Sequence, residues 1–407
     1  MDILHCDLNN FYASVEQAIN PQLKGKFVAV SGNPATRSGI ILAKNTAAKQ
    51  MGVKTGEAIW EAKQKCPKLV CVPPHFEYYS HFSKRVREIY EQYTDRVEGF
   101  GLDECWLDVT HSKIFGTPFE IAEKLRSEVR QKTGLTISVG VSFTKTFAKL
   151  GSDLKKPDAT TVISRENFKK VVWPLSVGEM LFIGPHTSQK LNAMGIFTLG
   201  DLAMADTDLL RKRFGIVGER LKNCALGLDC EEVRRADVHR EIKSVGHGTT
   251  ALRDMTCYKD AETVLCVLSE MVATRLRRYG MYGSVVHVDI RRNDLTHEAK
   301  QKTVPKTFVA KEIYNAGKEL LHSIWRGGAD KPLRSLSVNV SALSDVSSGV
   351  QMALWEEKNE KQQQLEFSLD KIRKKFGFDA IGTANTLHND LVSKNMASEE
   401  DLLPFKR

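Results

Sequence analysis

The chain has 407 residues, of which 59 are Lys or Arg and 50 are Asp or Glu, so its net charge at pH 7 is +9. This length is too great for one ordinary hydrophobic core, and we expect two to four domains. The shares of hydrophobic residues (42%) and charged residues (27%) are typical of an ordinary soluble globular protein. The basic excess favours a polyanionic partner, either nucleic acid or an anionic membrane surface. A merely solubilising surface charge is the alternative.

The eight cysteines include no Cys-x-x-Cys pair and no ladder of Cys and His ligands, and several of them lie in apolar runs. This pattern argues against a zinc site and for a reducing cytoplasm. The N-terminus has no basic stretch followed by an apolar one, and no segment approaches about 18 uninterrupted apolar residues. We therefore predict a cytoplasmic protein that is neither secreted nor membrane-spanning.

The N-terminal segment Met1–Leu8 reads as a short buried strand that ends in Asp7. A helix follows, and its first turn carries Phe11 and Tyr12. These two rings either cover a bound nucleotide or simply pack into a core.

The next segment predicts two further strands, Phe27–Gly32 and Gly39–Ala43, and then a helix that ends at Gly52. This helix carries Lys44 and Lys49 on adjoining faces. Either lysine could meet a triphosphate, and a solvated surface lysine is the alternative.

Two adjacent carboxylates, Asp103 and Glu104, lie between the apolar stretches Val97–Phe100 and Cys105–Val109, which we predict to be a hairpin of two strands. Neighbouring acids repel, so an arrangement in which both serve one site needs a cation. If the strand that ends in Asp7 lies beside this hairpin, three carboxylates meet at one sheet edge. Oxygen ligands of that number suit Mg²⁺ or Mn²⁺, and polymerases use such ion pairs for phosphoryl transfer. A solvated Asp-Glu turn is the alternative.

The elements around the hairpin support this convergence. Helical spacing recurs over Tyr78–Tyr93 and Phe119–Lys132, and a strand is expected at Thr136–Val141. The resulting order is the split βαβ, ferredoxin-like arrangement, which places the first strand next to the hairpin. A helix opening at Thr144–Leu150 and a turn at Lys155–Asp158 then bring lysines near the predicted site.

Two glycine-containing turns between short helices follow in tandem. The first contains Gly184 and His186, and the second contains Gly215 and Gly218. Backbone N–H groups at such turns can bind a DNA phosphate without reading sequence, as in helix-hairpin-helix motifs.

Residues 237–243 are polar and read as a linker. Strands at Ser244–His247, Ser284–Ile290 and Leu333–Val340 then alternate with helices at Asp260–Tyr279 and Lys311–Trp325, which predicts a second α/β sandwich. Its basic residues, which include Arg291, suit a duplex backbone.

Beyond residue 345 the sandwich pattern ends. Gln364–Phe376 predicts a basic amphipathic helix, and the chain from Asn385 onward is predicted to be disordered.

Several of these segments together resemble the Y-family translesion DNA polymerases, and most closely their bacterial polymerase IV branch. The resemblance rests on Asp7–Glu16, Gly101–Asp108, Lys156–Pro157, Phe182–Gly184 and Lys243–Gly246, and it spans about residues 1 to 345 in consistent order.

The fold class that the resemblance implies is a multidomain α+β chain, a right-handed polymerase. It would have a ferredoxin-like palm (1–10 and 77–165), small fingers (11–76), an all-α helix-hairpin-helix thumb (166–236), a linker (237–243), an α/β little finger (244–345) and a tail (346–407).

For the site, the resemblance implies that Asp7, Asp103 and Glu104 hold two Mg²⁺ ions, or Mn²⁺, with the carbonyl of Leu8 as a further ligand. Tyr12 matches the steric gate that excludes a ribose 2′-hydroxyl. Phe11 would give its amide to the triphosphate, which Lys156 would also bind. The family's usual fingers motif is altered here: its arginine is Lys49, still a candidate phosphate ligand, and Thr46 receives no role.

The implied partners are primer-template DNA and dNTPs, and the implied activity is error-prone synthesis of low fidelity and low processivity in DNA damage tolerance. A peptide similar to the family's sliding-clamp motif, Gln351-Met352-Ala353-Leu354-Trp355, implies a clamp partner. Nothing in the sequence demands more than a monomer. Two other classes stay open: a nucleotidyl cyclase with a similar sheet, and a non-catalytic DNA-binding or clamp-associated module.

Overall fold

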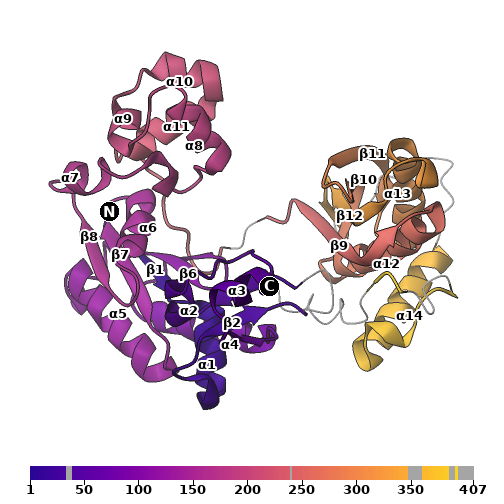
Figure 1. Cartoon of the computed structure of the whole chain (residues 1–407), viewed down its shortest axis with the longest axis horizontal. Coiled ribbons are helices and arrows are strands. Elements are labelled where there is room, and N and C mark those ends of the chain that lie inside the picture. The colour runs from indigo at the N-terminus through magenta and orange to yellow at the C-terminus, as the bar shows by residue number, and fades with distance from the viewer. Residues whose placement is uncertain (34–38, 239–240, 347–359, 385–389, 393–407) are drawn as a thin grey trace. The chain divides into compact units, whose positions relative to one another are not determined.

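The structure is a computed structural model that describes residues 1–33, 39–238, 241–346, 360–384 and 390–392 (Figure 1). The chain divides into two compact units. The first contains residues 1–32 and 40–238, and the second contains the described residues from 241 onward. No helix in the described ranges combines the length and the apolar character needed to cross a membrane.

The first unit is built on a five-stranded sheet with the strand order β5-β6-β1-β7-β8. These strands are β1 (Ile3–Leu8), β5 (Val97–Phe100), β6 (Glu104–Asp108), β7 (Ile137–Ser142) and β8 (Thr160–Ile163). The central strand β1 is antiparallel to both of its neighbours, and all its residues are buried. The predicted position of the first strand beside the hairpin is therefore confirmed.

Side chains of β1 alternate between two faces of this sheet. Leu4, Cys6 and Leu8 pack into a core with the helices α4 (Phe76–Tyr90) and α5 (Pro118–Thr133). Ile3 packs on the other face with Ala148 of helix α6 (Lys145–Leu154). Because side chains two apart on a strand share a face, His5 and Asp7 lie on the α6 side.

A second, smaller sheet in the first unit has the strand order β3-β2-β4. It comprises β2 (Val28–Ser31), β3 (Ile41–Lys44) and β4 (Val70–Val72), and it packs with the helices α2 (Thr46–Gln50) and α3 (Ile59–Lys65) around a core of its own. Helix α1 (Phe11–Ile19) joins this sheet to the end of β1 (Figure 1).

Short helices form the remainder of the first unit and share one apolar core. They are α7 (Phe168–Val172), α8 (Pro185–Asn192), α9 (Leu199–Met204), α10 (Thr207–Phe214) and α11 (Ile216–Ala225). After α11 the chain returns to the large sheet, where Val233 is fully buried against Ile3 and Trp106.

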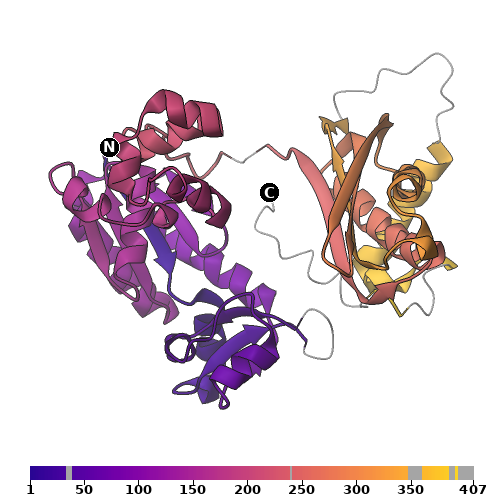
Figure 2. The ribbon, with the colours of Figure 1, turned by 45° about the horizontal axis from the view of Figure 1, so that its top comes forward.

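The second unit contains a four-stranded antiparallel path of order β11-β10-β12-β9, to which the two-residue strand β13 (Ser344–Asp345) adds at β10. Its long strands are β9 (Ser244–Met255), β10 (Met281–Arg292), β11 (His297–Thr307) and β12 (Leu333–Ser341). Figure 2 shows helices α12 (Tyr258–Arg278) and α13 (Ala310–Ile324) packed on one face of this sheet.

The described part of the tail folds onto this second unit. Helix α14 (Glu360–Phe376) supplies Glu366 and Asp370 to Arg277 of α12, whose side chain is only 1% exposed. Farther along, Leu391 and Val392 lie in the core of the unit. The prediction of disorder from Asn385 onward is therefore wrong for these two residues, whose apolar side chains are buried.

Further differences from the sequence predictions concern strands. Strand β6 begins at Glu104 rather than Cys105, so Asp103 is the last residue of the turn. Strands β4, β8, β11 and β13 were not predicted. Strand β8 has only four residues, and β11 is exposed along almost its whole length, so it lacks the alternation of apolar and polar residues that reveals a strand.

Candidate active site

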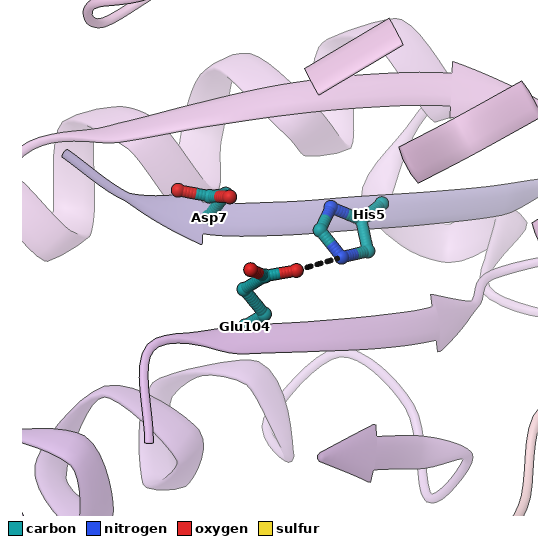
Figure 3. A group of neighbouring side chains, drawn as sticks. All are labelled: His5, Asp7 and Glu104. Atoms are coloured by element: carbon teal, nitrogen blue, oxygen red, sulfur yellow. Dashed lines mark ion pairs between the residues drawn. The ribbon is translucent and has the colours of Figure 1, made fainter. Parts of the chain in front are cut away.

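The carboxylates of Asp7 and Glu104 come from adjacent strands, where the two residues are direct partners in the antiparallel register of β1 and β6. The turn that carries Asp103 is fixed to the same strand, because the amide of Leu8 donates a hydrogen bond to the carbonyl of Asp103 (3.0 Å). Figure 3 shows Asp7 and Glu104 on neighbouring strands, together with His5. The structure thus brings the three predicted acids to one edge of the sheet.

His5 is a buried neighbour of these acids that the sequence analysis missed. Its Nε2 atom lies 3.1 Å from Glu104 Oε2, and its Nδ1 atom lies 2.9 Å from the hydroxyl of Ser152 (Figure 3). Ligand atoms of His5, Asp7 and Glu104 all lie within 4.8 Å of one another. The alternation of a strand could have revealed His5, since it lies two residues before Asp7.

Two lysine ammonium groups neutralise the acids. Lys149 of α6 lies 2.8 Å from Glu104 Oε2 and 3.1 Å from Asp7 Oδ2. Lys156 lies 2.7 Å from the same oxygen of Asp7 and 2.8 Å from Asp153. The predicted triphosphate lysine is therefore at the site. Lys149 belongs to the helix whose lysines were expected nearby, but it was not singled out.

Asp103 and Glu104 are adjacent but have opposite pKa shifts. Burial and the charges of Asp7 and Glu104 raise the pKa of Asp103 to about 6. Burial also acts to raise the pKa of Glu104, but contacts with His5 and Lys149 outweigh it and lower this pKa to about 2. Asp103 therefore carries the uncompensated charge of the cluster.

This donor set fits a hard divalent cation. Three carboxylates offer oxygen ligands on one edge, and burial together with the charges of Asp7 and Glu104 raises the pKa of Asp103, so a bound cation would favour its ionised form. Mg²⁺ and Mn²⁺ prefer oxygen ligands, and two of them close together suit phosphoryl transfer. His5 contacts the hydroxyl of Ser152 and Glu104, as an imidazole that orients a metal ligand does.

Tyr12 and Phe11 lie at the start of α1, in a cluster of aromatic rings. The Tyr12 ring is half-buried and stacks on Tyr79 of α4, with ring centroids 4.2 Å apart and planes at 12°. Phe76 meets the Tyr12 ring edge-on at 5.9 Å. Burial, and to a smaller extent the charge of Asp103, raise the pKa of Tyr12.

The altered fingers motif lies around α2. The side-chain amide of Asn10 donates a hydrogen bond to the hydroxyl of Thr46 (2.9 Å), so Thr46 links α2 to the end of β1. The charge of Lys49 adds to burial in lowering the pKa of Lys44. Within the described ranges, no ion pair joins Lys49 to the three acids.

The predicted DNA-binding turns lie among the short helices. Gly184 precedes α8, and because Pro185 has no N–H group, His186 carries the first free donor of that helix. Gly215 has a φ of +64° between α10 and α11. A Cβ atom on Gly218 would lie 2.5 Å from the carbonyl of Leu210, so Gly218 allows close packing of these two helices.

Arg291 lies in the second unit, on β10. It is paired with His297 of β11 and Ser335 of β12 in the register of the sheet. The proposed clamp residues Gln351, Met352, Leu354 and Trp355 lie outside the described residues.

Comparisons with known proteins agree with this fold. The model of the impB/mucB/samB family matches residues 6–153, and that of the impB/mucB/samB family C-terminal domain matches residues 242–354. DNA polymerase IV of Acetivibrio thermocellus is 44% identical over 383 residues, which cover 93% of this chain and 96% of that protein. DNA polymerase IV of Moorella thermoacetica is 37% identical over 390 residues, with coverage of 95% and 96%.

Solved structures are similar as well. The Y-family DNA polymerase chimera Dbh-Dpo4(243-245)-Dbh matches with a TM-score of 0.75 and 26% identity, covering 85% of this chain and all (100%) of that chain. DinB from Sulfolobus solfataricus matches with a TM-score of 0.55 and 26% identity, covering 84% and 98%.

The chain belongs to the impB/mucB/samB family, the Y-family DNA polymerases. Its relatives place it in the polymerase IV branch, and it is a DNA-directed DNA polymerase of the translesion type. The predicted family, fold class and activity are confirmed, and the nucleotidyl cyclase and the non-catalytic module are excluded.

Proposed function

We propose that Asp7, Asp103 and Glu104 are the catalytic carboxylates at which this chain adds a dNTP to a primer 3′-hydroxyl opposite a template strand. The observation that carries the proposal is the register pairing of Asp7 with Glu104, with Asp103 in the turn that follows β5. Residues 97 positions apart in the sequence thereby share one sheet edge, and no packing role requires acids there.

The three acids and the carbonyl of Leu8 would hold two Mg²⁺ ions, with Mn²⁺ as the alternative ion. When bound, these ions would lower the pKa of the primer hydroxyl and neutralise the leaving pyrophosphate. The chain itself supplies the ligands and their positions. His5 and Lys149 keep Glu104 ionised by lowering its pKa, so that it is ready to bind a cation at neutral pH.

The triphosphate would lie against the amide of Phe11 and the ammonium of Lys156, with Lys49 as a further candidate. The ammonium of Lys156 lies 2.7 Å from Asp7 Oδ2, so a triphosphate that shares a cation with Asp7 would lie within reach of this lysine. Tyr12 lies in the first turn of α1, the helix that follows β1 and Asp7. It would be the steric gate whose ring leaves no room for a 2′-hydroxyl.

The chain would bind DNA without recognising its base sequence. Amide groups near Gly184, His186, Gly215 and Gly218 would bind backbone phosphates of the primer-template, and Arg291 would bind them from the second unit. Gln351, Met352, Leu354 and Trp355 would bind a sliding clamp, and the chain would act as a monomer.

We assign the palm to residues 1–10 and 77–165, the fingers to 11–76, the thumb to 166–236, the linker to 237–243, the little finger to 244–345 and the tail to 346–407. We place the protein in the cytoplasm, because its substrate is DNA and its eight cysteines are all free thiols, as a reducing compartment favours.

Extension of a primed template with Mg²⁺ and four dNTPs tests the site. Wild-type protein should extend the primer, and Asp103→Ala and Glu104→Ala should lose about a thousandfold or more in rate while still binding DNA. Wild-type rates in either variant would contradict the assignment.

A further inference from the structure

Two aromatic rings of α4 pack against the ring of Tyr12. Tyr79, which is fully buried, stacks on one face of the ring at a centroid distance of 4.2 Å, and Phe76 packs edge-on against both tyrosines at 5.9 and 5.6 Å. A substrate can therefore meet Tyr12 only at its remaining face and edge. The Tyr12 ring cannot move toward α4 unless Tyr79 moves first.

Tyr79 is itself held by a buried carboxylate. Its hydroxyl donates a hydrogen bond to Glu16 Oε1, and the Glu16 residue is only 2% exposed. The Nδ1 atom of His75 lies 3.0 Å from the same oxygen and 3.1 Å from Oε2. Glu16 lies one helical turn after Tyr12 on α1. The same helix therefore carries the Tyr12 ring and the carboxylate that holds Tyr79 against it.

We propose that Glu16 and Tyr79 are positioning residues for sugar selectivity, which hold the Tyr12 ring where it excludes a ribose. This inference rests on the proposed function of Tyr12 as the steric gate. Neither positioning residue touches the nucleotide. Glu16 holds the end of the Tyr79 ring in place through the hydroxyl, and Tyr79 in turn holds the Tyr12 ring through the stack.

The physical reason is that the Tyr12 ring can exclude a ribose 2′-hydroxyl only if the ring is held in place. A ring that can rotate away from a 2′-hydroxyl admits a ribonucleotide at only the small free-energy cost of that rotation. The stacked ring of Tyr79 prevents this rotation. A buried tyrosine hydroxyl without its acceptor would also be unsatisfied, so breaking the pair frees the Tyr79 ring to seek another position.

Ordinary core packing is the rival explanation, and it makes a different prediction. If the cluster only stabilises α1 against α4, its disruption lowers the melting temperature and affects deoxyribonucleotides and ribonucleotides alike. If Glu16 and Tyr79 position the Tyr12 ring, their disruption changes the ratio of kcat/KM for ribonucleotides to kcat/KM for deoxyribonucleotides.

The experiment compares single-nucleotide incorporation of dATP and ATP opposite template thymine, measured as kcat and KM by the full-length chain. The variants are Tyr79→Phe, which keeps the stack and removes the hydroxyl, and Glu16→Gln, which removes the carboxylate charge. Tyr12→Ala reports on the gate alone, and the double variant Tyr12→Ala with Tyr79→Phe reports on coupling.

Tyr93→Phe is the matched control. The hydroxyl of Tyr93 donates a hydrogen bond to Glu128 Oε1 (2.5 Å), so this variant removes a Tyr–Glu bond of the same kind from the same unit. Among the described residues the Tyr93 ring contacts Phe115 rather than Tyr12. Melting temperatures of all variants show whether they fold.

We expect Tyr79→Phe to raise kcat/KM for ATP about fivefold relative to that for dATP, the factor that corresponds to one hydrogen bond of about 1 kcal/mol. Glu16→Gln should act in the same direction, Tyr93→Phe should leave the ratio unchanged, and Tyr79→Phe should add nothing in the Tyr12→Ala background.

Other outcomes overturn the inference in distinguishable ways. If Tyr12→Ala admits ATP but Tyr79→Phe and Glu16→Gln keep the wild-type ratio, the gate stands and the positioning role is wrong. Equal losses for both nucleotides would make the pair purely structural. If Tyr12→Ala keeps its discrimination, the proposed gate itself fails, and the inference fails with it.

Discussion

Asp7 and Glu104 are direct register partners across β1 and β6, and both carboxylates contact the ammonium group of Lys149 on the same face of the sheet. A strand pair can hold two acids this close only if cations offset their repulsion. The turn between β5 and β6 then adds Asp103, and within the described ranges no lysine or arginine forms an ion pair with its carboxylate. The site therefore combines positions fixed by the register with a charge that favours a cation.

The opposite pKa shifts of Asp103 and Glu104 predict opposite effects on stability in EDTA. The pKa of Asp103 rises from 3.8 to about 6 on folding, so its contribution to stability is lost as pH rises through that range. Asp103→Asn should therefore raise the free energy of unfolding at pH 8 by about 1–3 kcal/mol.

The pKa of Glu104 shifts in the opposite direction on folding. Its pKa falls from 4.5 to about 2, so its contribution is present above the ordinary pKa and is lost as pH falls toward 2. Glu104→Gln should cost about 1–3 kcal/mol at pH 8. Urea unfolding of both variants in EDTA checks the pair of predictions, and shifts of the same sign would contradict the account of the cluster.

Lys156 is predicted to act on the nucleotide rather than on the fold. Lys156→Met should raise KM for dNTPs about tenfold or more, because a charge contact to the triphosphate is lost. Lys155→Met is the control, since this neighbour is exposed and makes no ion pair within the described ranges. Steady-state incorporation kinetics decide the matter, and equal KM values for the two variants would remove Lys156 from the site.

Gly140 is predicted to be essential for placing α6. A Cβ atom there would lie 1.9 Å from the carbonyl of Ala148 and 2.5 Å from the amide of Ser152. Gly140→Ala should therefore separate α6 from β7 and destabilise the chain by about 3 kcal/mol or more. Gly178→Ala is the control, because its Cβ would make only an ordinary contact at 3.5 Å. Thermal unfolding compares them, and similar melting temperatures would show that the sheet tolerates the methyl group.

Packing of this kind limits what the sequence could predict. The three acids were predictable because residue type, strand pattern and element order all pointed to one edge. Lys149 was not singled out, because its position depends on the close approach of α6 to β7 at Gly140, which no local pattern reveals. The exposed strand β11 gave no alternation signal.

The folding of the tail onto the second unit was unpredictable for a similar reason. Helix α14 was expected from its own periodicity, but its docking depends on buried pairs between Arg277 and two acids far along the chain. Such pairs become visible only once both helices are placed.

These pairs yield a stability prediction of their own. Glu366 is 4% exposed, and its removal would leave the buried Arg277 with less compensation. Glu366→Ala should cost about 3–5 kcal/mol. Glu319→Ala, which breaks the exposed pair with Lys302, should cost less than about 1 kcal/mol. Urea unfolding of the full chain tests both, and a small loss for Glu366→Ala would mean that α14 adds little to the second unit.

Direct measurement of Mn²⁺ binding by electron paramagnetic resonance tests whether Asp7, Asp103 and Glu104 form one metal site, without relying on turnover. The wild-type chain with primer-template DNA and a non-hydrolysable dNTP should bind two ions. Asp7→Asn, Asp103→Asn and Glu104→Gln should each weaken binding about tenfold or more, while the Tyr93→Phe control should not. Wild-type Mn²⁺ affinity in all three carboxylate variants would contradict the account.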